Sequence, residues 1–252
     1  MKKIGRWLSA AAPVVLAMGG AVAVAAPAYA EPCPDVEVVF ARGTFEPPGV
    51  GATGQGFVDA LRARAPQKSI DVYAVNYPAS LDFATAADGV IDASNKVRDI
   101  AAQCPKTKIV LGGYSQGAAV AAYITADEVP EGYVLPPGLT GPMPADVADH
   151  VAAVALFGKP SAGFLQIIYR DAPPITVGPR YASKTTEQCI DGDPVCSTGG
   201  GGDRGLHGAY VAQGRTDQAA DFVVGKLPKG GSLRPPAPAP APEPAPEPVP
   251  AG

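Results

Sequence analysis

The chain has 252 residues, of which 46% are hydrophobic and 17% charged, and its formal net charge at pH 7 is −4. Its Lys and Arg residues form no cluster, which argues against a nucleic-acid partner, because phosphate binding needs a basic patch. The length suffices for one domain with a well-buried core.

Residues 1–30 are predicted to be a secretory signal peptide. Lys2, Lys3 and Arg6 form a positive segment, an apolar and alanine-rich stretch follows, and Ala-Tyr-Ala at 28–30 fits a cleavage site. A retained membrane anchor is the weaker alternative, because the stretch is rich in small residues. Cleavage leaves 17 basic and 24 acidic residues, a net charge of −7, and no integral membrane segment. We therefore expect a secreted protein.

The first half of the mature chain alternates predicted strands with predicted helices. Residues 36–41 are apolar and β-branched, as in a buried strand, and a loop rich in Pro and Gly follows. A surface helix is expected at 57–65 and a second strand at 70–77. Residues 82–103 predict a long helix with one apolar side.

A strand, a sharp turn and a helix are predicted around Ser115. The apolar run 108–112 precedes Gly-Tyr-Ser-Gln-Gly at 113–117, and the small residues 118–122 follow. In a G-x-S-x-G elbow the serine lies on a strained turn, and the glycines let strand and helix approach closely. The start of the helix offers free N–H groups and a positive dipole end, which suit an oxyanion. The pattern predicts Ser115 as a nucleophile, against the alternative of a glycine-rich turn with a chance serine.

After the elbow helix, expected to end near Asp127, an irregular segment rich in Pro and Gly runs to Pro144. Further strands are predicted at 151–157 and 178–187, and a last helix at 216–227. Buried strands alternating with helices imply a mainly parallel sheet covered on both faces. We therefore expect a three-layer α/β fold with a central five-stranded sheet.

Two stretches have no assigned role from their patterns alone. The apolar stretch at 164–175 fits either an acyl-binding groove or packing into the core. From residue 228 to residue 252, Pro alternates with Ala and Glu, which predicts a disordered tail that favours extended polyproline II. An inert linker is the first interpretation of this tail, and a docking or wall-spanning role is the alternative.

A serine nucleophile needs a base, and the chain has only two histidines. His150 precedes the strand at 151–157, so it is expected at the sheet edge opposite Ser115. His207 comes late in the chain, in the order Ser, Asp, His that this elbow architecture uses. The acid stays open between Asp191, Asp193 and Asp203, although a loop bracketed by cysteines would best fix an acid against an imidazole.

Four cysteines in an exported chain predict two disulfides rather than a metal site. Cys33, Cys104, Cys189 and Cys196 allow three pairings; a bridge between Cys189 and Cys196 would close a short loop and leave Cys33 for Cys104. No C-x-x-C or H-x-x-x-H spacing indicates zinc, and no phosphate-binding loop is present. We expect neither a metal nor a cofactor.

The chain resembles the cutinase family, especially its secreted actinobacterial esterases, from about Cys33 to Leu227. The resemblance rests on Ala-Arg-Gly-Thr-Phe-Glu at 41–46, the elbow at 113–117, the cysteine-bracketed sequence Cys-Ile-Asp-Gly-Asp-Pro-Val-Cys at 189–196, and the late histidine. It implies an α/β-hydrolase domain, here residues 31–227, and both disulfides named above. It also implies a triad in which Asp193, the fifth residue of the cysteine loop, is the acid beside Ser115 and His207.

The same resemblance implies an oxyanion hole made by the Gln116 N–H and by the N–H and hydroxyl of Thr44. It implies hydrolysis of short- to medium-chain acyl esters through an acyl-enzyme on Ser115, with polyesters and lipids as further candidate substrates. The segment 127–144 and the tail depart from smaller members. An acyltransferase with an alcohol acceptor and, more remotely, a non-catalytic surface protein are the alternatives. We expect a monomer, and the sequence leaves envelope association open.

Overall fold

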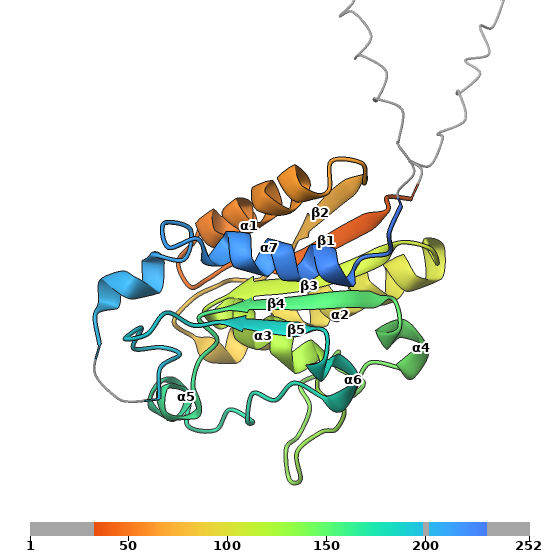
Figure 1. Cartoon of the computed structure of the whole chain (residues 1–252). Coiled ribbons are helices and arrows are strands. Elements are labelled where there is room, and N and C mark those ends of the chain that lie inside the picture. The colour runs from red at the N-terminus through yellow and green to blue at the C-terminus, as the bar shows by residue number, and fades with distance from the viewer. Residues whose placement is uncertain (1–32, 199–201, 231–252) are drawn as a thin grey trace, which may run out of the picture. The chain divides into compact units, whose positions relative to one another are not determined.

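The structure, a computed structural model, describes residues 33–198 and 202–230, so the predicted signal peptide and most of the predicted tail lie outside the described residues. Five strands form one sheet in the order β2-β1-β3-β4-β5, and every neighbouring pair is parallel (Figure 1). The strands are β1 (Val36–Ala41), β2 (Ile70–Ala74), β3 (Lys108–Tyr114), β4 (Val151–Phe157) and β5 (Thr185–Gln188). The predicted five-stranded parallel sheet is confirmed.

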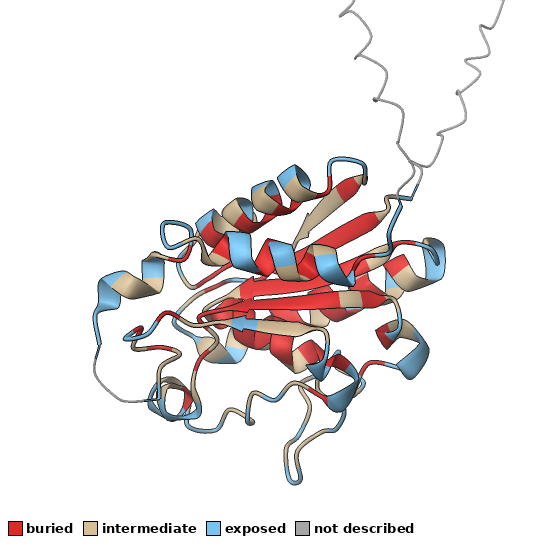
Figure 2. Ribbon diagram, viewed as in Figure 1, coloured by how far each residue is buried: buried red, intermediate tan, exposed pale blue. Residues whose placement is uncertain are grey.

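Helices cover both faces of this sheet (Figure 1). On one face α1 (Gly51–Arg64) packs with α7 (Arg215–Lys226), and on the other lie α2 (Ala86–Gln103) and α3 (Gln116–Ile124). Alternate residues of β1 enter the two cores: Val38 and Phe40 pack on the α1 and α7 side, Val39 on the other. Because a strand covered on both faces is apolar at every position, β1 has the continuous apolar run that predicted it. Figure 2 shows the central strands buried along their length.

Shorter helical turns connect these elements. They are η1 (Phe83–Thr85), α4 (Ala145–Ala148), α5 (Ala162–Ile168), α6 (Pro179–Ala182) and η2 (Arg204–Gly208). The long helix expected at 82–103 is therefore a 3-10 turn followed by α2. None of the described helices has the length and apolar character that a membrane span requires.

The first helix starts earlier than predicted, at Gly51 rather than at Phe57. Its glycines indicated a loop, but the Glu46 carboxylate accepts the Ala52 N–H at 2.8 Å and so satisfies one donor of the first turn. Gly54 is needed inside the helix because an added Cβ would lie 2.7 Å from the Phe40 ring. Close packing against β1, rather than turn formation, explains this glycine.

Three other boundaries also differ from the prediction. β5 covers only Thr185–Gln188, because Pro179 begins α6 inside the predicted strand, with Gly178 as its N-cap. β2 ends at Ala74 rather than at residue 77, and α3 ends at Ile124, before Asp127.

The loops that follow β1, β3 and β4 begin side by side at the carboxyl edge of the sheet. Ala41 pairs with Gly113, and Tyr114 pairs with Phe157. The chain leaves β1 for β2 on one side and later returns to β3 on the other, so the order of strands switches between β1 and β3. In open parallel sheets, ligands bind outside the carboxyl ends of strands at such a switch.

Two disulfides join the four cysteines, Cys33 with Cys104 and Cys189 with Cys196. These are the pairings that the resemblance implies. The first ties the start of the described chain to the end of α2, and the second closes the short loop after β5. Chain-entropy estimates give about 4 kcal/mol of stabilisation for the long loop and about 2 to 3 kcal/mol for the short one.

Candidate active site

Ser115 lies on the turn between β3 and α3 in a strained backbone conformation. Its φ is 54° and its ψ is −118°, which few residues other than glycine adopt. Strand and helix approach so closely that an added Cβ on Gly113 would lie 2.0 Å from the Gly117 carbonyl oxygen. One on Gly117 would lie 2.0 Å from the Ala41 carbonyl oxygen. The two glycines therefore have the close-approach role that the elbow motif predicts.

His207, carried by η2, connects Ser115 to an acid. Its Nε2 lies 2.8 Å from Ser115 Oγ, and its Nδ1 lies 2.8 Å from Asp193 Oδ2. Residues 92 positions apart in the sequence are therefore within hydrogen-bond distance. The geometry is that of a nucleophile, a base and an orienting acid.

Asp193 is fully buried, at 0% exposure, in the loop closed by the Cys189–Cys196 disulfide. Its Oδ1 accepts the Val195 N–H at 2.9 Å, and its Oδ2 accepts the Tyr210 hydroxyl at 2.6 Å. Burying a carboxylate requires such partners. Of the other candidate acids, Asp191 is exposed, and the exposed Asp203 accepts the Gly205 N–H at the start of η2. The structure thus brings Asp193 alone of the three to His207.

Two tyrosines hold this arrangement, and the sequence motifs predicted a role for neither. Tyr114 donates its hydroxyl to the His207 carbonyl oxygen at 2.6 Å, and its ring lies 5.0 Å from the imidazole ring. Tyr210 is fully buried and donates to Asp193. Burial raises the pKa of both phenols above the ordinary range, so both remain donors. Their positions, directly before Ser115 and three residues after His207, were the available signal.

The other histidine is far from this site. His150 precedes β4, and its carbonyl oxygen accepts the Ile109 N–H at 2.9 Å, near the start of β3. That is the amino edge of the sheet, opposite Ser115, as the sequence predicts. Its Nδ1 is buried and has no hydrogen-bond partner among the described residues.

Gln116 is the first residue of α3, where backbone N–H groups have no intrahelical acceptor. The neighbouring Ser115 N–H is already bound to the Phe157 carbonyl oxygen at 2.8 Å. The Gln116 side chain is 3% exposed and donates to the Ser80 carbonyl oxygen at 3.0 Å. It ties α3 to the loop that leads into η1, and its backbone N–H lies in the first turn of the helix, directly after Ser115.

Thr44 follows β1 and is half-buried in a tightly held loop. The buried Arg42 guanidinium donates to the carbonyl oxygens of Glu46 at 2.8 Å and Tyr77 at 2.6 Å. The Glu46 carboxylate accepts the Gly43 N–H at 2.6 Å. This loop therefore presents Thr44 from a fixed backbone at the same edge as Ser115. Arg42 and Glu46 belong to the motif at 41–46, and this role in holding the loop was not predicted from the sequence.

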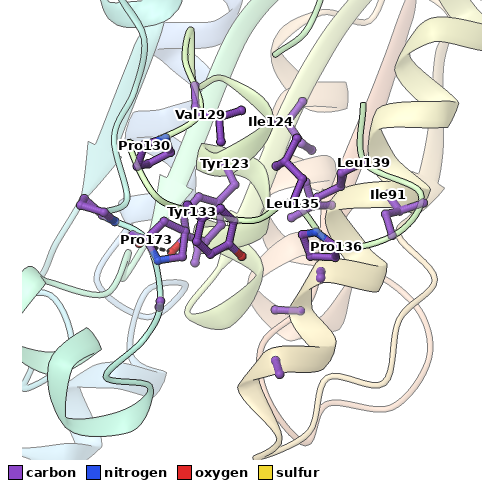
Figure 3. Close-up of a pocket in the computed structure, with 18 of the residues that line it drawn as sticks. Ile91, Tyr123, Ile124, Val129, Pro130, Tyr133, Leu135, Pro136, Leu139 and Pro173 are labelled. Atoms are coloured by element: carbon purple, nitrogen blue, oxygen red, sulfur yellow. Dashed lines mark hydrogen bonds between the residues drawn. The ribbon is translucent and has the colours of Figure 1, made fainter. Parts of the chain in front are cut away.

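Two pockets lie next to the site. The first, of about 500 Å³, is lined by Gln116 and mainly by apolar residues of η1, α2, α3 and the segments 128–143 and 165–174 (Figure 3). The second, of about 800 Å³, is lined by His207 and by residues of α5 and the acid loop. The apolar stretch at 164–175 serves both: Leu165 and Tyr169 line the first pocket, and Phe164 and Ile167 the second. Ile175 packs against the core instead.

Within residues 33–198 and 202–230, no group of three or more His, Cys, Asp or Glu residues is arranged to hold a metal ion. The side chains gathered at Ser115 are those of acyl transfer, in which a serine oxygen attacks a carbonyl carbon.

The sequence profile described as Cutinase matches residues 32–227. Carboxylesterase Culp1 of Mycobacterium tuberculosis is 46% identical over 217 residues, which cover 86% of this chain and 92% of the relative. Phospholipase Culp4 of the same organism is 46% identical over 234 residues, 88% of this chain and 96% of the relative. The solved structure of Trichoderma reesei cutinase in complex with a phosphonate inhibitor is 32% identical, with a TM-score of 0.57 and coverage of 78% of each chain.

Proposed function

Because the chain belongs to the cutinase family and has its α/β-hydrolase fold, we propose that it is a secreted serine esterase that acts through an acyl-enzyme on Ser115. That it is a carboxylic ester hydrolase follows from its relatives. The observation that supports the mechanism is the continuous hydrogen-bonded chain from Ser115 through His207 and Asp193 to Tyr210.

Acylation begins when Ser115 Oγ attacks the ester carbonyl carbon and His207 Nε2 takes the hydroxyl proton. Asp193 holds Nδ1 protonated, which leaves the lone pair of Nε2 facing the serine, and it stabilises the imidazolium that forms. His207 then donates its new proton to the leaving alcohol oxygen as the carbon–oxygen bond breaks. The products of this half are the free alcohol and an ester on Ser115.

Deacylation repeats these steps with water. His207 takes a proton from the water molecule as its oxygen attacks the acyl carbon, and it returns that proton to Ser115 Oγ as the ester bond breaks. The acid is released and the enzyme is restored. In both halves, the developing oxyanion would accept hydrogen bonds from the Gln116 N–H and from Thr44, and one such donor typically lowers the barrier by about 3 to 4 kcal/mol.

Domain layout and localisation form part of the proposal. Residues 1–30 would be removed on export, 31–227 would form the catalytic domain, and 228–252 would form the tail. All four cysteines are paired, as suits an oxidising compartment. Mass spectrometry of the protein from culture medium should find Glu31 as the first residue, and a cell-bound protein that retains residues 1–30 would contradict export. Sedimentation should find a monomer.

The test of function is hydrolysis of p-nitrophenyl esters from acetate to palmitate by the mature protein and by Ser115→Ala. We expect the wild type to release p-nitrophenol and Ser115→Ala to lose about ten-thousandfold or more of the rate. Ser183→Ala, which removes an exposed serine hydroxyl at a position that lines neither pocket, is the matched control and should retain most activity. An equal rate for Ser115→Ala and the wild type would exclude the mechanism.

A further inference from the structure

We propose that the pocket of about 500 Å³ binds the acyl chain of the substrate, and that the segment from Val129 to Met143 forms the wall that sets which chain length is preferred. We call this pocket the acyl pocket and this segment the pocket wall. The inference rests on the proposed function, because it assigns a ligand to a pocket beside the same serine. It deepens that function by naming the residues that would favour ten-carbon over four-carbon chains within the short to medium range that the resemblance implies.

The acyl pocket is enclosed from four directions. Its sides are the start of α2 with η1, the outer side of α3, the pocket wall and the residues that follow α5 (Figure 3). The Tyr123 hydroxyl on α3 donates to the Pro173 carbonyl oxygen at 2.6 Å, which closes one side. The wall supplies Tyr133, Leu135 and Leu139. A volume of this size lies within the range of about 300–1,000 Å³ that ligand pockets have.

The chemistry of the lining selects an uncharged, apolar ligand. Among the described residues that line the pocket there is no Lys, Arg or His, and the two carboxylates, Asp88 and Glu128, belong to exposed residues. An anionic headgroup would find no cation here and would meet two like charges. A hydrocarbon chain needs no polar partner and gains free energy from every methylene group that it buries.

The position of the pocket relative to the reacting atoms assigns it to the acyl side of the ester. Gln116, the proposed oxyanion donor, lines the acyl pocket, and so does Ala119 one turn further along α3. His207, which protonates the leaving alcohol, instead lines the second pocket. An ester at Ser115 therefore has its acyl chain on the α3 side and its alcohol on the η2 side.

The wall is held in place mainly by apolar contacts. Met143 is buried in the core, and Leu139 packs against the same core cluster. A hydrogen bond of 3.4 Å joins Arg98 to Thr140. None of these contacts involves Ser115, Asp193 or His207, so the wall can change chain-length preference without changing the chemistry.

The test is to place a larger side chain in the acyl pocket from α2 and to measure kcat/KM for a long and a short ester. Ala87 lines the acyl pocket and is half-buried, so Ala87→Phe places a ring in the space of the acyl chain. Ala162→Phe, on α5 in the second pocket, is the matched control. We expect the wild type to prefer p-nitrophenyl decanoate to p-nitrophenyl butyrate, and Ala87→Phe to lower kcat/KM for decanoate while butyrate stays within about twofold.

The size of the effect follows from the burial of methylene groups. Each buried group contributes about fourfold in affinity, so displacing two of them should lower kcat/KM for decanoate about fifteenfold. Ala162→Phe should leave the ratio of the two esters unchanged. An equal loss on both esters in folded Ala87→Phe, or a changed ratio in Ala162→Phe, would overturn the assignment. Ala84→Phe, at an exposed position of η1 that also lines the pocket, replaces Ala87→Phe if the latter unfolds.

A binding measurement separates this inference from the proposed function. Methyl decanoate should raise the Tm of Ser115→Ala, whereas methyl butyrate should not, and methyl decanoate should have little effect on Ser115→Ala with Ala87→Phe. Ester hydrolysis by the wild type without this pattern of binding would reject the acyl pocket and leave the esterase standing. Binding of methyl decanoate without any ester hydrolysis by the wild type would support the pocket and reject the esterase.

Discussion

The proposed triad and the pocket wall are built from opposite kinds of contact, although both belong to the same site. Asp193, 0% exposed, is held by the Val195 N–H, the His207 imidazole and the Tyr210 hydroxyl. The wall has no regular secondary structure between Val129 and Met143, and Val134 in its middle is 86% exposed. Directional bonds fix the reacting atoms, and apolar contacts shape the space for the substrate. A change in the first region should therefore affect all esters, and one in the second only some.

The largest effect is expected from Asp193→Asn. An amide can offer its N–H to His207 and thereby place the imidazole proton on the wrong nitrogen, so kcat should fall about ten-thousandfold for butyrate and decanoate alike. Steady-state assays with p-nitrophenyl butyrate and p-nitrophenyl decanoate measure this fall in kcat. Asp191→Asn, in the same disulfide loop but exposed, is the control and should behave as the wild type. A fall confined to decanoate would place Asp193 in substrate binding instead.

Thr44→Val should weaken turnover about a hundredfold, because it removes one hydroxyl donor from the developing oxyanion. Thr44→Ser retains that hydroxyl and should recover most of the rate. The unfolding temperature should change little in either variant, because Thr44 is only half-buried. If Thr44→Val kept full activity on both esters, Thr44 would have no place in the oxyanion hole.

Tyr210→Phe should lower kcat/KM about tenfold for all esters, because a hydrogen bond to a charged group is worth about 1.5 kcal/mol or more. Tyr210 lines neither pocket and donates to Asp193, so we expect it to act by positioning that acid. The acid limb of the pH–rate profile should move to higher pH, since a carboxylate with one donor fewer holds the protonated imidazole more strongly. A loss of activity with an unmoved acid limb would indicate a packing role alone.

The smallest expected effect is on the free energy of unfolding at high pH, in the variant that combines Tyr114→Phe with Tyr210→Phe. Burial raises the pKa of Tyr114 and Tyr210 in the folded protein above the ordinary value of about 10. The folded state therefore binds these protons more tightly than the unfolded chain, and this stabilisation is present below about pH 10 and is lost as the pH rises further. Urea denaturation at neutral and alkaline pH should show a smaller alkaline loss for Tyr114→Phe with Tyr210→Phe than for the wild type. An equal loss would show that these phenols do not control alkaline unfolding.

The sequence predicted the parts of this molecule where the pattern is periodic or the motif is dense. The apolar runs of β1, β3 and β4 follow from burial on both faces, and the elbow follows from its two glycines. The start of α1 was missed because Gly54 packs against Phe40 rather than forming a turn. The position of a glycine in the sequence does not by itself distinguish close packing inside a helix from a turn.

The partners of Ser115 were predictable only in part. The chain has two histidines. Because His150 precedes a parallel strand, it is predicted at the edge of the sheet opposite Ser115, which leaves His207 as the base. The residues alone do not decide between Asp191, Asp193 and Asp203, and the family resemblance selects Asp193. Tyr210 and the pocket wall were not predicted, because a phenol that holds a carboxylate and a Pro-rich segment that encloses a pocket depend on contacts between distant parts of the chain.

The central claim is that an acyl group is transferred to Ser115, and trapping that intermediate tests it most directly. The wild type is mixed with p-nitrophenyl decanoate, quenched in acid within the first turnovers, digested and analysed by mass spectrometry. We predict a decanoyl mass on the peptide that contains Ser115, and none on this peptide in Ser115→Ala. A decanoyl group on another residue, or rapid hydrolysis by Ser115→Ala, would contradict the mechanism.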